Sequence, residues 1–184
     1  CIRDSQDTAA HWASEEIGRM TDRGVLKGYE DGSFRPNNQI TRGEYATVMA
    51  RALEFEAREY KVPFKDVKEG MWYTEPVISL YEKGIVTGRL DGTFGVNDAI
   101  TNEEMAVMLT RGLTALEIEL QVERPYVEFI DANEISSFAK DAVKVLYKAG
   151  IITTYELLLL GTKCFIFHLL GDCEKVTINL RRHT

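Results

Sequence analysis

Residues 12–53 read WASEEIGRMTDRGVLKGYEDGSFRPNNQITRGEYATVMARAL, and residues 72–113 read WYTEPVISLYEKGIVTGRLDGTFGVNDAITNEEMAVMLTRGL. The two stretches align without a gap at an offset of 60 residues, and fourteen positions carry the same residue type. Repeats of this length indicate a modular architecture, because one small unit cannot bury its apolar face alone and stacks on its neighbours. Function is therefore expected from what the repeated turns and exposed side chains present together.

Each unit is predicted to fold as a helix, a turn-rich loop and a second helix. In the first unit, apolar residues near 3.6-residue spacing end at Gly24, which suits a helix C-terminus because glycine adopts a positive φ without strain. The Asp31-Gly32 pair predicts a tight turn. Phe34, repeated as Phe94, is expected to pack from the loop into the core.

A capping box predicts the start of the second helix in both units. The hydroxyl of Thr41 can accept from the amide of Glu44, and the Glu44 carboxylate can accept from the amide of Thr41. Thr101 and Glu104 repeat this arrangement. In the first unit the apolar face behind the cap is predicted to extend toward Tyr60.

A third unit begins and then loses the pattern. The run from Phe129 to Asp131 matches the start of unit two, and residues 142–153 match residues 76–87, but Thr154 stands where Gly28 and Gly88 stand. No Asp-Gly turn and no capping box follow, so the tail is either the product of a reading-frame change or a divergent helix pair. The predicted divisions are residues 7–62, 63–124, 125–154 (a partial repeat) and 155–184 (a divergent tail).

The composition narrows the classes of partner. The net charge is −7 and the pI is about 5.1, which disfavours nucleic acid because the chain has no basic run to neutralise phosphates. No segment has the roughly 18 uninterrupted apolar residues that a membrane span needs. Three cysteines do not make a disulfide framework. Cys1 is either the acylated residue of a mature lipoprotein or the end of a fragment.

No catalytic, cofactor or metal motif is found. The chain has no nucleophile elbow, no HExxH motif, no phosphate-binding loop and no Gly-rich dinucleotide turn. The Asp-Gly loop lacks the carboxylates of an EF-hand, and the spacing of Cys164, His168, Asp172 and Cys173 matches no common structural zinc site. We therefore expect no enzyme activity, no cofactor and no bound metal.

The combination of motifs resembles the S-layer homology module over about residues 7 to 154. The matching residues of the first unit are Trp12, Gly28, Asp31-Gly32-Ser33-Phe34-Arg35-Pro36 and Ile40-Thr41-Arg42-Gly43-Glu44. The resemblance implies an all-α fold: a pseudo-trimeric helical bundle with ligand grooves between adjacent units. It also implies non-covalent attachment of exported proteins to a secondary cell-wall polysaccharide, commonly one with pyruvylated sugars.

The resemblance implies a set of ligand-contacting positions: Trp12, Gly28, Asp31 and Arg42 in unit one, and Trp72, Gly88 and Asp91 in unit two. Arg42 in the first turn of a capped helix would place a guanidinium beside free backbone amides, which suits a carboxylate. Asn102 occupies the equivalent position in unit two and should weaken anion binding by roughly 1 to 2 kcal/mol. The expectation is one competent groove centred on Arg42, one weakened groove and one malformed groove.

Structural alternatives stand beside these assignments. Trp12 and Trp72 could be core residues that seal a helix–helix contact. Arg42 could be an ordinary solvated residue, and Asp31 and Asp91 could serve only to form turns.

The leading functional hypothesis is a carbohydrate-binding anchor, located outside the cell at the wall or S-layer. The alternative is a protein-interaction scaffold of helical repeats at the cell surface. An incomplete third repeat would also leave apolar surface open, which favours self-association.

Overall fold

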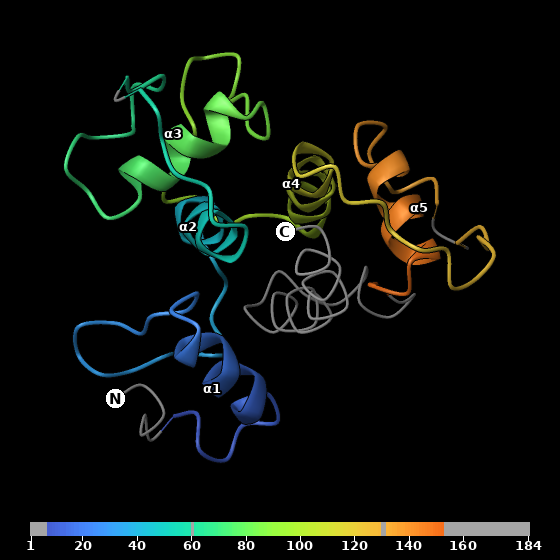
Figure 1. Ribbon diagram of the computed structural model, residues 1–184, viewed down its shortest axis with the longest axis horizontal. Helices are drawn as coiled ribbons and strands as arrows, with labels where there is room; N and C mark the ends of the chain where they lie inside the picture. Colours follow the sequence, from blue (N-terminus) through green and yellow to red (C-terminus); the bar gives the residue numbers. More distant parts are fainter. Residues whose placement is uncertain (1–6, 60, 130–131, 153–184) are drawn as a thin grey trace.

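The computed structural model describes residues 7–59, 61–129 and 132–152 (Figure 1). This part of the chain contains five α-helices and no β-strand, so the all-α prediction is confirmed. The helices are α1 (Ser14–Asp22), α2 (Arg42–Ala52), α3 (Thr74–Glu82), α4 (Asn102–Ala115) and α5 (Lys140–Lys148). Among the described residues, no helix combines the length and apolar character needed to cross a membrane.

Both predicted capping boxes are present. At the start of α2, Glu44 N donates to Thr41 Oγ1 at 3.2 Å and Thr41 N donates to Glu44 Oε2 at 2.8 Å. The same pair of bonds joins Thr101 and Glu104 at the start of α4. The amides that a helix start leaves without intrahelical partners are thus partly satisfied within the chain.

The second helix of unit one is shorter than the sequence analysis predicted. Its apolar face was expected to extend toward Tyr60, but α2 ends at Ala52. Glu54 adopts a φ of 54°, and the amide of Phe55 donates back to the carbonyl of Ala50 at 2.8 Å. A residue in the left-handed region closes a helix by this kind of backward bond, although glycine is the usual choice.

Helices pack across the boundaries of the sequence repeats. Helix α2 of unit one packs against α3 of unit two, α4 of unit two packs against α5 of unit three, and α2 also meets α4. In Figure 1, α2 and α4 lie near the centre, with α3 and α5 outside them and α1 apart from the other four. The second helix of one unit is therefore covered by the first helix of the next. The matching second helix of unit three would fall after residue 152, outside the described residues.

The core is apolar and continuous between units. Phe34 and Phe94 are 4% and 0% exposed, as predicted, and Tyr45 and Met105 lie where α2 and α4 meet. The Tyr45 hydroxyl donates to the carbonyl of Met105 at 3.0 Å, which satisfies a polar atom that burial would otherwise leave costly.

A carboxylate fixes each loop that follows the Asp-Gly turn. Asp66 accepts from the amides of Phe94, Gly95 and Val96 at 2.7, 2.7 and 3.1 Å, and Asp7 accepts from the amides of Phe34 and Arg35 in the same way. Burial alone would raise the pKa of Asp66, but the three amides together outweigh it and hold the pKa below its ordinary value. The ionised carboxylate is therefore the form that the folded loop favours.

Candidate functional site

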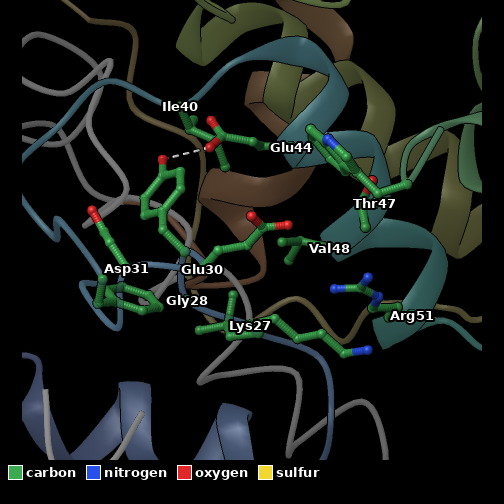
Figure 2. A pocket seen from close by; sticks show the side chains of 13 residues that line it. Lys27, Gly28, Glu30, Asp31, Ile40, Glu44, Thr47, Val48 and Arg51 are labelled. Atoms are coloured by element: carbon green, nitrogen blue, oxygen red, sulfur yellow. Dashed lines mark hydrogen bonds between the residues drawn. The ribbon is translucent and has the colours of Figure 1, made fainter.

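A pocket of about 730 Å³ lies between unit one and unit two. One wall is the loop after α1, the other is formed by Glu44, Thr47, Val48 and Arg51 of α2, and Trp72 is contributed from just before α3. Its lining residues are Leu26, Lys27, Gly28, Tyr29, Glu30, Asp31, Phe34, Ile40, Glu44, Thr47, Val48, Arg51 and Trp72. Figure 2 shows the labelled polar side chains arranged around the cavity. Two units build this pocket, as expected from helices that pack across repeat boundaries.

The two tryptophans lie on the surface and not in the core. Trp12 is 68% exposed and Trp72 is 53% exposed, so the alternative that they seal a helix–helix contact is wrong. Phe138, two residues before α5, is 59% exposed and holds the same place relative to its helix. An exposed ring before each first helix is thus a shared feature of the three units, and the sequence analysis did not identify Phe138.

Gly28 and Asp31 both line the pocket, as expected of ligand-contacting positions. Asp31 also forms the turn: it accepts from the Ser33 amide at 2.9 Å, from the Ser33 hydroxyl at 2.6 Å and from Arg35 Nη2 at 2.6 Å. These bonds, the Ser33 hydroxyl first, lower its pKa to about 2. Asp31 is therefore a fixed anion whose main partners are within its own loop.

A hydrogen bond ties the loop to the helix across the pocket. The Tyr29 hydroxyl donates to Glu44 Oε1 at 2.6 Å, drawn as a dashed line in Figure 2. Burial of the hydroxyl and its bond to the Glu44 carboxylate raise the pKa of Tyr29 to about 12. Since the other oxygen of Glu44 caps α2, both carboxylate oxygens have partners within unit one.

Arg42 lies in the junction between the units, and it does not line this pocket. Its side chain is buried: Nε donates to the carbonyl of Phe94 at 2.9 Å, Nη1 pairs with Glu104 Oε1 at 2.7 Å, and the guanidinium lies over the Phe94 ring. The alternative of a solvated Arg42 is therefore wrong.

The backbone amides beside Arg42 are also occupied. The amide of Arg42 donates to the carbonyl of Asp98 at 2.9 Å, and the amide of Gly43 donates to the carbonyl of Val96 at 3.0 Å. The expectation that Arg42 stands beside free amides is wrong, because the loop of unit two folds over the first turn of α2. The Arg42 guanidinium and the two amides, which were expected to bind a ligand carboxylate, instead hold the two units together.

The expected positions of unit two have different surroundings. A Cβ on Gly88 would lie 2.2 Å from Phe64 Cε1, so an aromatic ring of the same chain fills the space beside this glycine. Asp91 accepts from the amide and hydroxyl of Thr93 and so forms its turn as Asp31 does. Asn102 begins α4 and is partly buried.

Two cations of the pocket were missed by the sequence analysis. Lys27 extends from the loop and Arg51 from the last turn of α2, and Figure 2 shows both at the same end of the cavity. Arg51 recurs as Arg111 in the second repeat, so the repeat could have indicated this position as a candidate site residue. The sequence could not tell which copy lines a cavity.

A model of the S-layer homology domain family matches residues 2–46, 63–106 and 128–157. The chain is similar to an endoglucanase of Bacillus sp. (strain KSM-635), with 36% identity over 136 residues, covering 74% of this chain and 14% of that protein. It is also similar to the surface-layer 125 kDa protein of Lysinibacillus sphaericus, with 35% identity over 145 residues, covering 79% of this chain and 12% of that protein. A cellulosome-anchoring protein of Acetivibrio thermocellus is 34% identical over 117 residues, covering 61% of this chain and 26% of that protein. The chain thus spans a small part of these relatives.

Proposed function

The chain belongs to the S-layer homology domain family, and we propose that it is the wall-attachment module of a larger exported protein. Domains of this family anchor S-layer proteins and cell-surface enzymes to the cell wall, and the domain itself is non-catalytic. Relatives in which the matching part is a small fraction of the length include an endoglucanase and a surface-layer protein. The cargo of this chain is then carried by sequence beyond the three units.

The pocket between units one and two is the observation that supports a saccharide ligand. Its volume of about 730 Å³ suits a small saccharide, and its walls combine apolar side chains with convergent polar groups. We propose that the ligand is an acidic, pyruvylated sugar of a secondary cell-wall polysaccharide. A protein of net charge −7 must bind such a ligand through local contacts, which a partly enclosed pocket provides.

Three of the expected residues have proposed roles in this pocket. Trp72 offers an exposed indole face for a sugar ring and an N–H donor for a hydroxyl. Gly28 lets the saccharide approach the main chain. Asp31, held in place by its turn, presents carboxylate oxygen to sugar hydroxyls.

The other expected positions belong to further grooves. Gly88, Asp91 and Asn102 would serve a weaker groove between units two and three, where Phe138 replaces the indole. Trp12 would serve a groove whose other half lies outside the described residues. Self-association through the third unit likewise depends on residues after 152.

Sedimentation with purified cell walls tests the proposed function. The chain is expected to pellet with intact walls and to remain in solution after chemical removal of the polysaccharide. Trp72→Ala should weaken binding roughly tenfold, whereas Trp12→Ala, a change of a more exposed indole outside the pocket, should have a smaller effect. Binding that survives polysaccharide removal would favour the protein-interaction scaffold instead.

A further inference from the structure

We propose that Arg51, with Lys27 beside it, is the group that recognises the negative charge of the ligand, and that Arg42 is a structural tie between units. This inference rests on the proposed function, because it identifies the residues that select an acidic saccharide within the same pocket. It moves the anion contact from the start of α2 to its last turn.

The Arg51 guanidinium has no partner among the residues that the structure describes. Arg51 is partly buried and lines the pocket, yet its guanidinium makes no hydrogen bond and no ion pair with any residue in the described part of the chain. Burial lowers the pKa of Arg51 without any compensating carboxylate. A cation that is partly removed from water and has no counter-charge gains strongly from an incoming anion, and a guanidinium can hold a carboxylate through two parallel bonds.

Two of the three pocket carboxylates are engaged by other groups. Asp31 is held by Ser33 and Arg35, and Glu44 is held by the Tyr29 hydroxyl and the amide of Thr41. These carboxylates are fixed by bonds within unit one and do not pair with Arg51. The anion that completes the site is therefore expected from the ligand.

The remaining carboxylate sets a limit on the charge of that ligand. Glu30 is exposed, lines the same pocket and makes no hydrogen bond or ion pair with the residues that the structure describes. Figure 2 shows its side chain extending from the loop into the pocket, toward Val48 of α2. This acid repels further negative charge in the pocket, so a ligand with several phosphates is disfavoured relative to a ligand with a single carboxylate. The ligand class is thus a monoanionic saccharide.

The equivalent arginine of unit two has different surroundings. Arg111 is the equivalent of Arg51, but its Nη1 donates to the carbonyl of Ile85 at 3.2 Å. Thr87 stands where Lys27 stands, so the second cation is also missing. Unit two therefore lacks both the unpartnered guanidinium and the second cation, and Arg111 serves as an internal control within the same chain.

Calorimetric titration with a matched pair of ligands tests the assignment. The probes are a methyl hexoside with a 4,6-linked pyruvate ketal and the methyl ester of the same ketal, which has nearly the same shape without the charge. The unaltered chain is expected to prefer the acid over the ester by about tenfold or more. Arg51→Met should remove this preference and leave ester binding unchanged, while Lys27→Met should reduce the preference by about threefold. Glu30→Gln should tighten acid binding, and Arg111→Met should change neither probe.

The outcomes separate this inference from the proposed function. If Arg51→Met keeps the preference for the acid while Trp72→Ala loses both probes, the saccharide site stands and the role of Arg51 is refuted. If the unaltered chain binds neither probe nor purified polysaccharide, the proposed function fails and the anion site fails with it. Unchanged ester binding shows that the Arg51→Met pocket has folded, so a loss of acid binding alone supports the assignment.

Discussion

Replacing Arg42 by Met distinguishes a structural tie from a ligand contact. Methionine retains an apolar stem of similar length but removes the guanidinium that bridges the two units. In the native chain that group donates to the carbonyl of Phe94, pairs with Glu104 and lies over the Phe94 ring, with a side chain only 9% exposed. The substitution therefore leaves a buried carbonyl without its donor and a carboxylate without its cation.

The expected loss of stability follows from these contacts. A hydrogen bond that involves a charged group contributes about 1.5 to 3 kcal/mol, and breaking a fully buried ion pair costs about 3 to 5 kcal/mol. The carboxylate of Glu104 is 28% exposed and keeps its bond to Thr101, so part of that cost is relieved by water. The free energy of unfolding is therefore expected to fall by about 2 to 3 kcal/mol.

Urea denaturation followed by circular dichroism measures this change. Arg89→Met is the matched control, because Arg89 forms an ion pair with Asp98 in the same unit, but with side chains 44% and 52% exposed. Exposed pairs contribute about 0 to 1 kcal/mol, so the control should lose much less. A loss below about 0.5 kcal/mol for Arg42→Met, together with lost wall binding, would refute the structural role and restore Arg42 as a ligand residue.

Three further predictions concern loops and close contacts. Asp66→Asn should lower the free energy of unfolding by about 1 to 2 kcal/mol at neutral pH, because a carboxamide has one acceptor oxygen where the carboxylate has two. The folded pKa of Asp66 lies below its ordinary value of 3.8. Its contribution to the free energy of unfolding is therefore present above pH 3.8 and is lost as the pH falls through the folded pKa. The urea midpoints of parent and variant should converge in acid. Gly43→Ala should destabilise the chain in thermal melts, because the new Cβ would lie 2.9 Å from Val96 Cγ1 and 3.0 Å from its carbonyl oxygen. Gly88→Ala should cost more than Gly43→Ala in the same melts, since it combines a φ of 71° with a 2.2 Å clash against Phe64; equal melting temperatures would contradict this.

The sequence predicted well what depends on local chemistry. The capping boxes at Thr41 and Thr101 form because their partners are three residues away, and Phe34 is buried because its own loop turns back. The helix–loop–helix units were predicted from apolar residues near 3.6-residue spacing, and the all-α fold from the family resemblance. The end of α2 was missed because Glu54, a non-glycine residue, takes the left-handed conformation.

The site was predicted less well because it depends on contacts between units. Arg42 is buried only because residues 94–98 of unit two fold over the start of α2. The exposure of Trp72, and the lack of a partner for the Arg51 guanidinium among the described residues, also depend on contacts between distant parts of the chain. The repeat showed that Arg51 and Arg111 correspond, but it could not show that one faces a cavity and the other donates to Ile85.

The packing of α2 on α3 places the pairs of packed helices out of phase with the sequence repeat. Recombination at the boundary between the sequence repeats, near residue 62, would separate α2 from α3, the helix that packs on it. It would also separate Trp72 from the other pocket residues. A junction inside the loop between α1 and α2 would instead transfer α2, Trp72 and α3 together. Chimeras joined between α1 and α2 should therefore retain cooperative unfolding. Exchange of repeats during evolution should tolerate this junction better than a junction near residue 62.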